Sequence, residues 1–236
     1  MKPLYERRMH TGQEFPDHVH FALTANDVCH AAGAQPVISA AVSRCTVLEY
    51  VPDQDWLIQH GSANGWHWHV LATLGHRPDL LYTKLPPRGL VPYHCPRSWD
   101  RLSTMLNSTA FDDSMAGVVA AGCVGEPAAV EFTRVREHVA RNLPDPAIVV
   151  TDPDKAPLPS SPMDLYCLLV GAAGHVRNND AARLSAALRY TERLFQHPDG
   201  PKPQGMLFLT LLRLANAKAH STWTTFASSP AGKHYA

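Results

Sequence analysis

Twenty prolines are spread along this chain of 236 residues, and they limit its helices and strands more than any other residue type does. Proline lacks the backbone N–H and clashes with the preceding helical turn, so it ends helices and is excluded from the middle of a sheet. Between its prolines the chain has room for short segments with tight connections. The proline pattern therefore predicts a protein built mainly from short helices.

The charge of the chain is balanced, with 21 Lys and Arg residues against 21 Asp and Glu residues. Such a balance creates no net field for nucleic acid or for a membrane surface, so neither is expected as a partner. No apolar run approaches the roughly 20 residues of a membrane span, and the first eight residues lack the apolar core of a signal peptide. We therefore expect a cytoplasmic protein.

The cysteines indicate a reduced protein. They are odd in number and none forms a C-x-x-C pair, which argues against a disulfide framework. We expect reduced, mostly buried thiols at all five positions: Cys29, Cys45, Cys95, Cys123 and Cys167.

The first fifth of the chain has the pattern of a strand, a loop, a helix and a second strand. Apolar residues alternate with others over 19–23, which predicts a strand that ends just before Asn26. A loop with glycine and small alanines follows, and Pro36 then stands at the first position of a predicted helix that ends in Arg44. A second apolar strand is predicted at 46–51.

Beyond residue 52 the apolar residues recur mostly at helical spacing. Pro96 stands at a helix start, and Gly125 is expected to end a helix because its Gly-rich surroundings lack the lysine of a phosphate-binding loop. Residues 206–214 are apolar nearly all round and are expected to form the central helix of a bundle. The predicted helices cover 53–61, 67–82, 96–106, 111–124, 127–139, 163–176, 179–195 and 204–215.

Four short motifs follow the strand, loop and helix pattern in a fixed order. They are Asp55-Trp56, Asn64-Gly65, Arg77-Pro78-Asp79-Leu80-Leu81 and Pro96-Arg97-Ser98-Trp99. In identity and order they resemble the lid of the MoxR-like AAA+ ATPases of phage and bacterial type, while residues 18–51 resemble the last strands of the AAA+ core. The C-terminal helices resemble the extension of the same proteins, so the resemblance covers most of the chain.

The resemblance implies a predominantly α-helical protein with a remnant of an α/β AAA+ core. Residues 1–52 would be the end of that core, with about two strands. Residues 53–143 would be a helical lid, and residues 144–236 a C-terminal helical bundle.

The same resemblance assigns roles to three side chains. Asn26 matches sensor 1, which orients the water that attacks the γ-phosphate, and Arg44 matches the arginine finger that reaches the nucleotide of a neighbouring subunit. Arg97 matches sensor 2, the lid arginine that contacts the γ-phosphate. These residue types suit the roles because phosphoryl transfer depends on positioning and on neutralising charge on the transferred group. ATP and Mg²⁺ are the implied cofactors.

The sequence contains no G-x-x-x-x-G-K-[ST] motif and no Asp-Glu pair that ends an apolar strand. The only Gly-Lys pair is Gly232-Lys233, which His234 follows. Without a phosphate cradle and carboxylates for Mg²⁺, the chain is not expected to bind or hydrolyse ATP alone. It would be a gene fragment or a degenerate subunit whose partners are AAA+ subunits in a ring or a missing P-loop segment. The remodelled protein substrate is not identified.

Each of these assignments has a plainer alternative. Asn26 could be an ordinary strand-end residue, Arg44 could interact with a helix dipole, and Arg97 could be a surface residue, although a cation in a first helical turn is mildly unfavourable. The whole chain could be a helical protein-interaction module that binds no nucleotide. Titration with ATP and Mg²⁺ separates these alternatives.

The run Trp66-His67-Trp68-His69 has a spacing that metal ligands can use. In a strand the two histidines would share a face, whereas in the predicted helix they diverge by roughly 200°. No third ligand is close in sequence, so no metal site is expected.

Overall fold

The computed structural model describes residues 7, 8, 11–24, 43, 45–49, 51–84, 87 and 89–235. The chain divides into two compact units, which we describe separately. The first comprises Met1–Val51 with Lys84–Gly89, and the second comprises Pro52–Thr83 with Leu90–Ala236. The described residues are predominantly helical, which confirms the predicted α class.

In the first unit, the described residues contain one isolated antiparallel bridge, between Arg8 and Glu14. An ion pair of 2.7 Å joins the same two side chains, and the ring of Phe15 meets that of Phe21 edge-on at 5.0 Å.

The two strands predicted at 19–23 and 46–51 are not formed in the described part of this unit. A strand needs a neighbour for its backbone hydrogen bonds, and no described segment pairs with either stretch. Their apolar side chains are exposed, with 59% for Leu23 and 85% for Leu48. The alternation of apolar residues was therefore not sufficient to predict a strand in these two segments.

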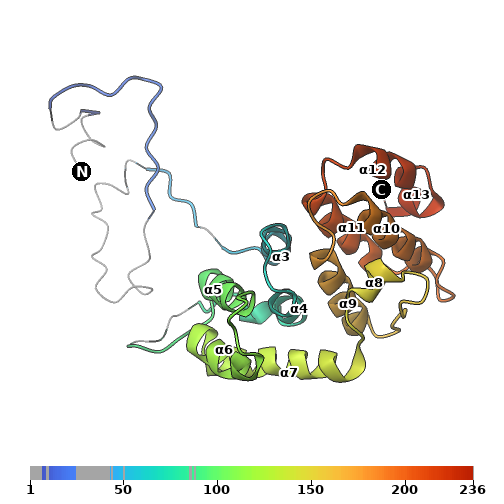
Figure 1. Ribbon diagram of the computed structural model, residues 1–236. Coiled ribbons are helices and arrows are strands. Elements are labelled where there is room, and N and C mark those ends of the chain that lie inside the picture. The colour runs from blue at the N-terminus through green and yellow to red at the C-terminus, as the bar shows by residue number, and fades with distance from the viewer. Residues whose placement is uncertain are drawn as a thin grey trace. The chain divides into compact units, whose positions relative to one another are not determined.

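The second unit is helical throughout its regular segments (Figure 1). Its first part contains α3 (Gln54–Ala63), α4 (Trp68–His76), η2 (Pro78–Leu80), α5 (Pro96–Leu106), η3 (Asp113–Met115), α6 (Ala116–Val124) and α7 (Glu126–Asn142). Its second part contains α8 (Ile148–Thr151), α9 (Pro162–Gly174), α10 (Ala181–Phe195), α11 (Gln204–Ala215), α12 (His220–Ala227) and α13 (Pro230–Tyr235). None of the described helices is long and apolar enough to cross a membrane.

Local sequence explains where several of these helices begin and end. Asp53 caps α3 by accepting a hydrogen bond of 2.7 Å from the Trp56 N–H, and Asp180 caps α10 by accepting from the N–H groups of Ala182 and Arg183. Helix α4 ends at His76, earlier than predicted, because the residue before Pro78 is disfavoured in a helix. Gly125 separates α6 from α7 with φ +83°, a conformation that suits glycine.

Residues 206–214, predicted as the central helix of the C-terminal bundle, lie in α11, which packs on α3, α9, α10 and α13. Of the two apolar helices, α9 is the more deeply buried. Eight of the thirteen residues of α9 are buried. In α11, by contrast, Met206 and Leu214 are each 46% exposed. Both sequences are apolar nearly all round, so their different burial comes from how closely the neighbouring helices cover each one.

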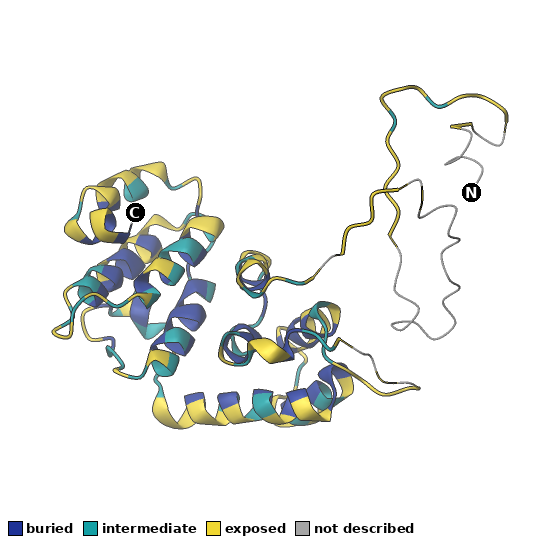
Figure 2. Ribbon diagram, turned by 180° about the vertical axis from the view of Figure 1, so that it is seen from behind, coloured by how far each residue is buried: buried dark blue, intermediate teal, exposed yellow. Residues whose placement is uncertain are grey.

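The lid and extension ranges inferred from the sequence contribute to one compact unit. Helix α4 packs on α9, and α3 packs on α11, so each range covers part of the other's apolar surface. Helix α7 shows a buried side toward its neighbours and an exposed outer side (Figure 2). The core is continuous across the boundary at 143/144.

Candidate functional site

Arg97 is the second residue of α5, and its side chain is exposed. Pro96 provides the first helical position, where its missing N–H costs no hydrogen bond. The N–H of Cys95 donates to Ser98 Oγ at 2.9 Å, and this bond fixes the first turn of the helix. The start of α5 is therefore well defined around an arginine that faces solvent.

Trp99 anchors α5 to the turn that contains the Arg77-Pro78-Asp79-Leu80-Leu81 motif. Its side chain is fully buried, and its Nε1–H donates to the carbonyl of Leu80 at 2.7 Å. The Thr83 N–H also donates to the His94 carbonyl at 3.0 Å, which joins the segments that precede and follow Lys84–Gly89. The motif at 77–81 and the motif at 96–99 are thus held together by hydrogen bonds and packing.

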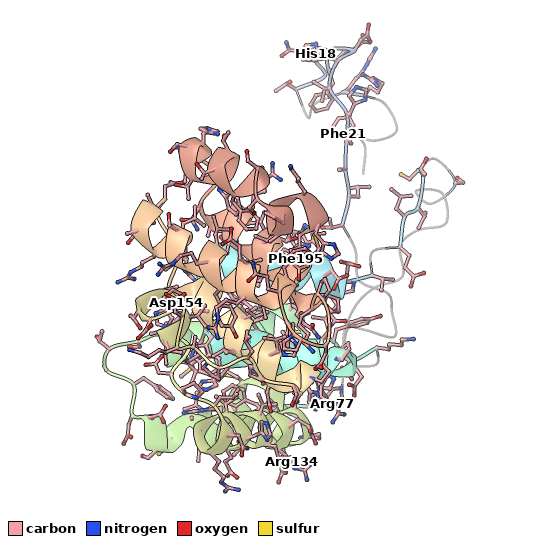
Figure 3. All side chains as sticks on the ribbon, turned by 90° about the vertical axis from the view of Figure 1, so that its right-hand side faces the viewer. His18, Phe21, Arg77, Arg134, Asp154 and Phe195 are labelled. Carbon is pink, nitrogen blue, oxygen red and sulfur yellow. The ribbon has the colours of Figure 1, made fainter. Side chains whose placement is uncertain are left out.

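A small ion-pair network holds the same turn. Arg77 pairs with Asp79 at 2.8 Å and with Glu131 of α7 at 3.0 Å. Arg134 pairs with Glu131 at 2.7 Å, and Figure 3 shows Arg77 and Arg134 near each other. The hydrogen bond from Arg77 lowers the pKa of Asp79. The network is mostly exposed and is expected to position the turn more than to stabilise the fold.

The Asn64-Gly65 motif reaches the other end of α5. Asn107 Nδ2 donates to the carbonyl of Gly65 at 2.8 Å, and the His67 N–H donates to Ser103 Oγ at 2.7 Å. Helix α5 is therefore held at both ends by motif residues.

We expect Trp99→Phe to lower the free energy of unfolding by about 2 kcal/mol, because the buried carbonyl of Leu80 loses its donor and the smaller ring leaves a gap. Urea unfolding followed by circular dichroism measures the change. Trp56→Phe is the matched control, because Trp56 is 52% exposed and should tolerate the change. Equal stability of the two variants would contradict the anchoring role.

The structure describes one of the three side chains assigned by resemblance. Asn26 and Arg44 lie outside the described residues, so the roles that the resemblance implies for them stay predictions. Arg97 forms no ion pair within the part of the chain that the structure describes. Its guanidinium is therefore available for an external oxyanion.

The two histidines at 67 and 69 do not diverge, and that prediction is wrong. Helix α4 begins at Trp68, so His67 is its N-cap residue and does not share the helical rotation. The two imidazole rings stack with centroids 5.1 Å apart, and Trp68 stacks on His69 at 3.8 Å. Among the described residues, no group of three or more His, Cys, Asp or Glu side chains could hold a metal ion.

Burial makes this histidine pair neutral at physiological pH. Desolvation, with a smaller contribution from Arg136, lowers the pKa of His67 to about 4. Desolvation, with contributions from His67 and Arg136, lowers the pKa of His69 to about 3. The Nδ1 atom of His69 is buried without a hydrogen-bond partner in the described structure.

A cavity of about 690 Å³ opens beside His69. Trp68 and His69 line it from α4, and Thr133 and Arg136 line it from α7. Arg136 binds both carboxylate oxygens of Asp113, at 2.6 and 2.7 Å, so its charge is already paired. Sequence reasoning noticed the two histidines but missed Arg136, which reaches them only because α7 packs on α4.

The cysteines add no reactive centre to the described structure. The four described cysteines are free thiols: Cys123 and Cys167 are buried, Cys95 is partly buried and Cys45 is exposed. Burial raises the pKa of Cys167 to about 12, so this thiol stays protonated.

Comparisons with protein-family models, with curated proteins and with solved structures find no match to this chain.

Proposed function

We propose that the helical unit is the lid and C-terminal extension of a MoxR-like AAA+ ATPase, and that α5 presents Arg97 to the γ-phosphate of ATP. The nucleotide and its Mg²⁺ would be held by a P-loop outside this sequence. In the complete assembly Asn26 would orient the attacking water, and Arg44 would act on the nucleotide of a neighbour. ATP hydrolysis would then drive remodelling of a protein substrate.

One observation carries the proposal: three of the four motifs that resemble the family meet at α5 and leave Arg97 exposed. Trp99 and Asn107 hold the helix at its two ends, while the Arg97 side chain points to no acidic partner among the described residues. An arginine in the first turn faces the positive end of the helix dipole, which is mildly unfavourable. Such a placement is understandable if the residue serves an external phosphate.

The exposed apolar residues of the first unit also support the proposal. Phe21, Leu23, Val47, Leu48 and Val51 are between 41% and 85% exposed. Several exposed apolar residues close together are typical of a surface that another part of an assembly covers. A P-loop-bearing core is the kind of partner that would cover them.

Complementation tests the role of Arg97. The P-loop half of a MoxR-like ATPase is mixed with this chain, and ATP turnover is measured with the wild-type chain, Arg97→Ala and Arg97→Lys. We expect the wild-type chain to restore turnover and Arg97→Ala to lose about tenfold or more of it, because a positioned arginine neutralises charge in the transition state. Arg97→Lys should recover only part, since lysine cannot bind two oxygens in a fork.

Arg101→Ala is the matched control, because Arg101 is exposed one turn further along α5. It should leave turnover unchanged while sedimentation shows the same extent of assembly for all variants. Equal turnover with the wild-type chain and Arg97→Ala would remove the proposed role. Titration calorimetry of the chain alone should show no Mg²⁺-dependent binding of ATP, because the sequence contains no P-loop motif.

A helical protein-interaction module is the second candidate, and the outer face of α6 favours it. Helix α6 carries no charged residue, yet Val118 is 65% exposed and Met115, just before it, is 46% exposed. An apolar helix with an uncovered face is typical of docking surfaces. If the chain is such a module, we expect it to assemble with the P-loop half in the complementation experiment. ATP turnover should then be the same with the wild-type chain and with Arg97→Ala.

A further inference from the structure

The loop between α9 and α10 holds its backbone in an unusual conformation. Asn178 and Asn179 have φ +60° and +58°, two consecutive residues in the left-handed region. Asparagine tolerates this region better than most residues, but each such residue carries strain that the surrounding structure must offset. The loop is therefore held in place by contacts elsewhere.

The contact that holds the loop is the side chain of Asn216, which is fully buried. Its Nδ2 donates to the carbonyls of Val176 and Leu212 at 2.8 and 3.0 Å, and its Oδ1 accepts from the Asn179 N–H at 3.0 Å. The Lys218 N–H donates to Asn179 Oδ1 at 2.9 Å. The loop is thus clamped on both sides of Arg177.

Arg177 is a partly buried cation without a counter-charge in the described structure. Its Nε is buried and has no hydrogen-bond partner, and its guanidinium lies against Gly65, where a Cβ would come within 2.6 Å of Nη1. Gly65 also has φ +80°, a conformation that suits glycine. Both the close guanidinium and the backbone conformation therefore require glycine at this position. Burial lowers the pKa of Arg177, and no carboxylate of the described residues offsets this.

Arg177 lines a cavity of about 470 Å³ together with His67, Trp68, Asn107 and His175. No acidic residue is among the described residues that line this cavity. Arg177 also follows the C-terminus of α9, where the helix dipole favours a cation. The favourable interaction with the helix dipole is small compared with the free-energy cost of desolvating an unpaired guanidinium.

We propose that this cavity binds an oxyanion, the phosphate or carboxylate group of a small ligand, through Arg177. The guanidinium offers its N–H groups in a fork that matches two oxygens of such a group. His67 and Asn107 provide polar groups beside it, and Trp68 provides an aromatic wall. This site is independent of Arg97 and of the proposed ATPase role.

The first test uses the wild-type chain and inorganic phosphate or acetate at constant ionic strength. The ¹⁵N resonance of Arg177 Nε is expected to shift and saturate with the bound oxyanion. A shift with phosphate alone identifies a phosphate site, and a shift with both anions identifies a general oxyanion site. No saturable shift with either anion overturns the proposal.

The second test uses Arg177→Met, which keeps most of the side-chain volume and removes the charge. At about ten times the dissociation constant, phosphate should raise the Tm of the wild-type chain by about 3 °C and leave Arg177→Met at its chloride value. Without phosphate, Arg177→Met should unfold at the same or a higher temperature than wild type, because a partly buried charge without a counter-charge is removed.

Arg213→Met is the matched control, because Arg213 is an exposed arginine in the last turn of α11. It should keep the full response to phosphate. An equal phosphate response in Arg177→Met and wild type shows non-specific salt stabilisation and overturns the proposal. A lower Tm of Arg177→Met in chloride assigns Arg177 a structural role and also overturns it.

Discussion

Lowering the pH from 7.5 to 4.5 should reduce the free energy of unfolding of the helical unit by about 3–5 kcal/mol, through His67 and His69. Their pKa values fall from 6.5 to about 4 and about 3 in the folded protein. Below pH 6.5 the unfolded chain takes up a proton at each residue, whereas the folded chain does not until near pH 4. Each proton that only the unfolded chain binds lowers the free energy of unfolding by about 1.4 kcal/mol per pH unit. The partial exposure of the two histidines reduces the total.

The charged groups around His67 and His69 shift the pKa values of these histidines in both directions. Arg136 lowers the pKa of both histidines, and Asp113 raises that of His67 by a smaller amount than burial lowers it. The full stability is therefore present above about pH 6.5 and is lost progressively below it. A loss of this size is comparable to the total stability of many domains.

Urea unfolding at pH 7.5, 6.5, 5.5 and 4.5 measures the effect, and His69→Phe tests its origin. Phenylalanine can keep the stacking on Trp68 and has no buried nitrogen to satisfy, so the slope should fall by about 1.4 kcal/mol per pH unit. His76→Gln is the control on the same helix, because His76 is exposed. A stability that stays constant between pH 7.5 and 4.5 would show that the pair is not desolvated.

Asn216→Ala should lower the free energy of unfolding by about 3 kcal/mol and the Tm by roughly 10 °C. The substitution removes three side-chain hydrogen bonds and leaves the carbonyls of Val176 and Leu212 and the N–H of Asn179 without their partner. Asn216→Asp should also be destabilising, because a carboxylate keeps the acceptor but loses both donors and buries a charge.

Asn178→Gly provides the contrasting variant in the same loop. Asn178 is exposed with φ +60°, and glycine adopts this conformation without steric cost, so stability should stay equal or rise by about 0.5 kcal/mol. Differential scanning calorimetry of the two variants measures both effects. A loss below about 1 kcal/mol in Asn216→Ala would mean that the loop around Arg177 keeps its conformation without this amide.

Helix capping and helix ends were predictable from local sequence. Asp53 and Asp180 cap their helices because a short acidic side chain reaches the first free N–H groups whatever the rest of the chain does. Gly125 ends α6 for an equally local reason. Pro78 should have marked the end of α4 as well, and the prediction extended that helix too far because its apolar residues continue beyond the proline.

The arrangement of side chains from different helices was not predictable in this way. The apolar sequences of α9 and α11 gave no sign of which would be more buried, since that depends on how closely the neighbouring helices cover each one. His67 and His69 were visible in the sequence, but the burial that mainly lowers their pKa values, and the added effect of Arg136 from α7, arise only from packing. Arg177 attracted no notice, because its lack of a counter-charge is a property of the packed structure.

The sequence by itself determined the helical class and most helix starts, because propensity, capping and proline effects act within a few residues. It also contained the motif through which Arg97 was chosen as a candidate residue. Only the tertiary structure decided that the two segments near the N-terminus form no strand among the described residues and that Trp99 and Asn107 secure α5. It also decided that the Nε of Arg177 is buried without a partner in the described structure. Hydrogen bonds and desolvation between distant segments depend on three-dimensional packing, and no local pattern encodes them.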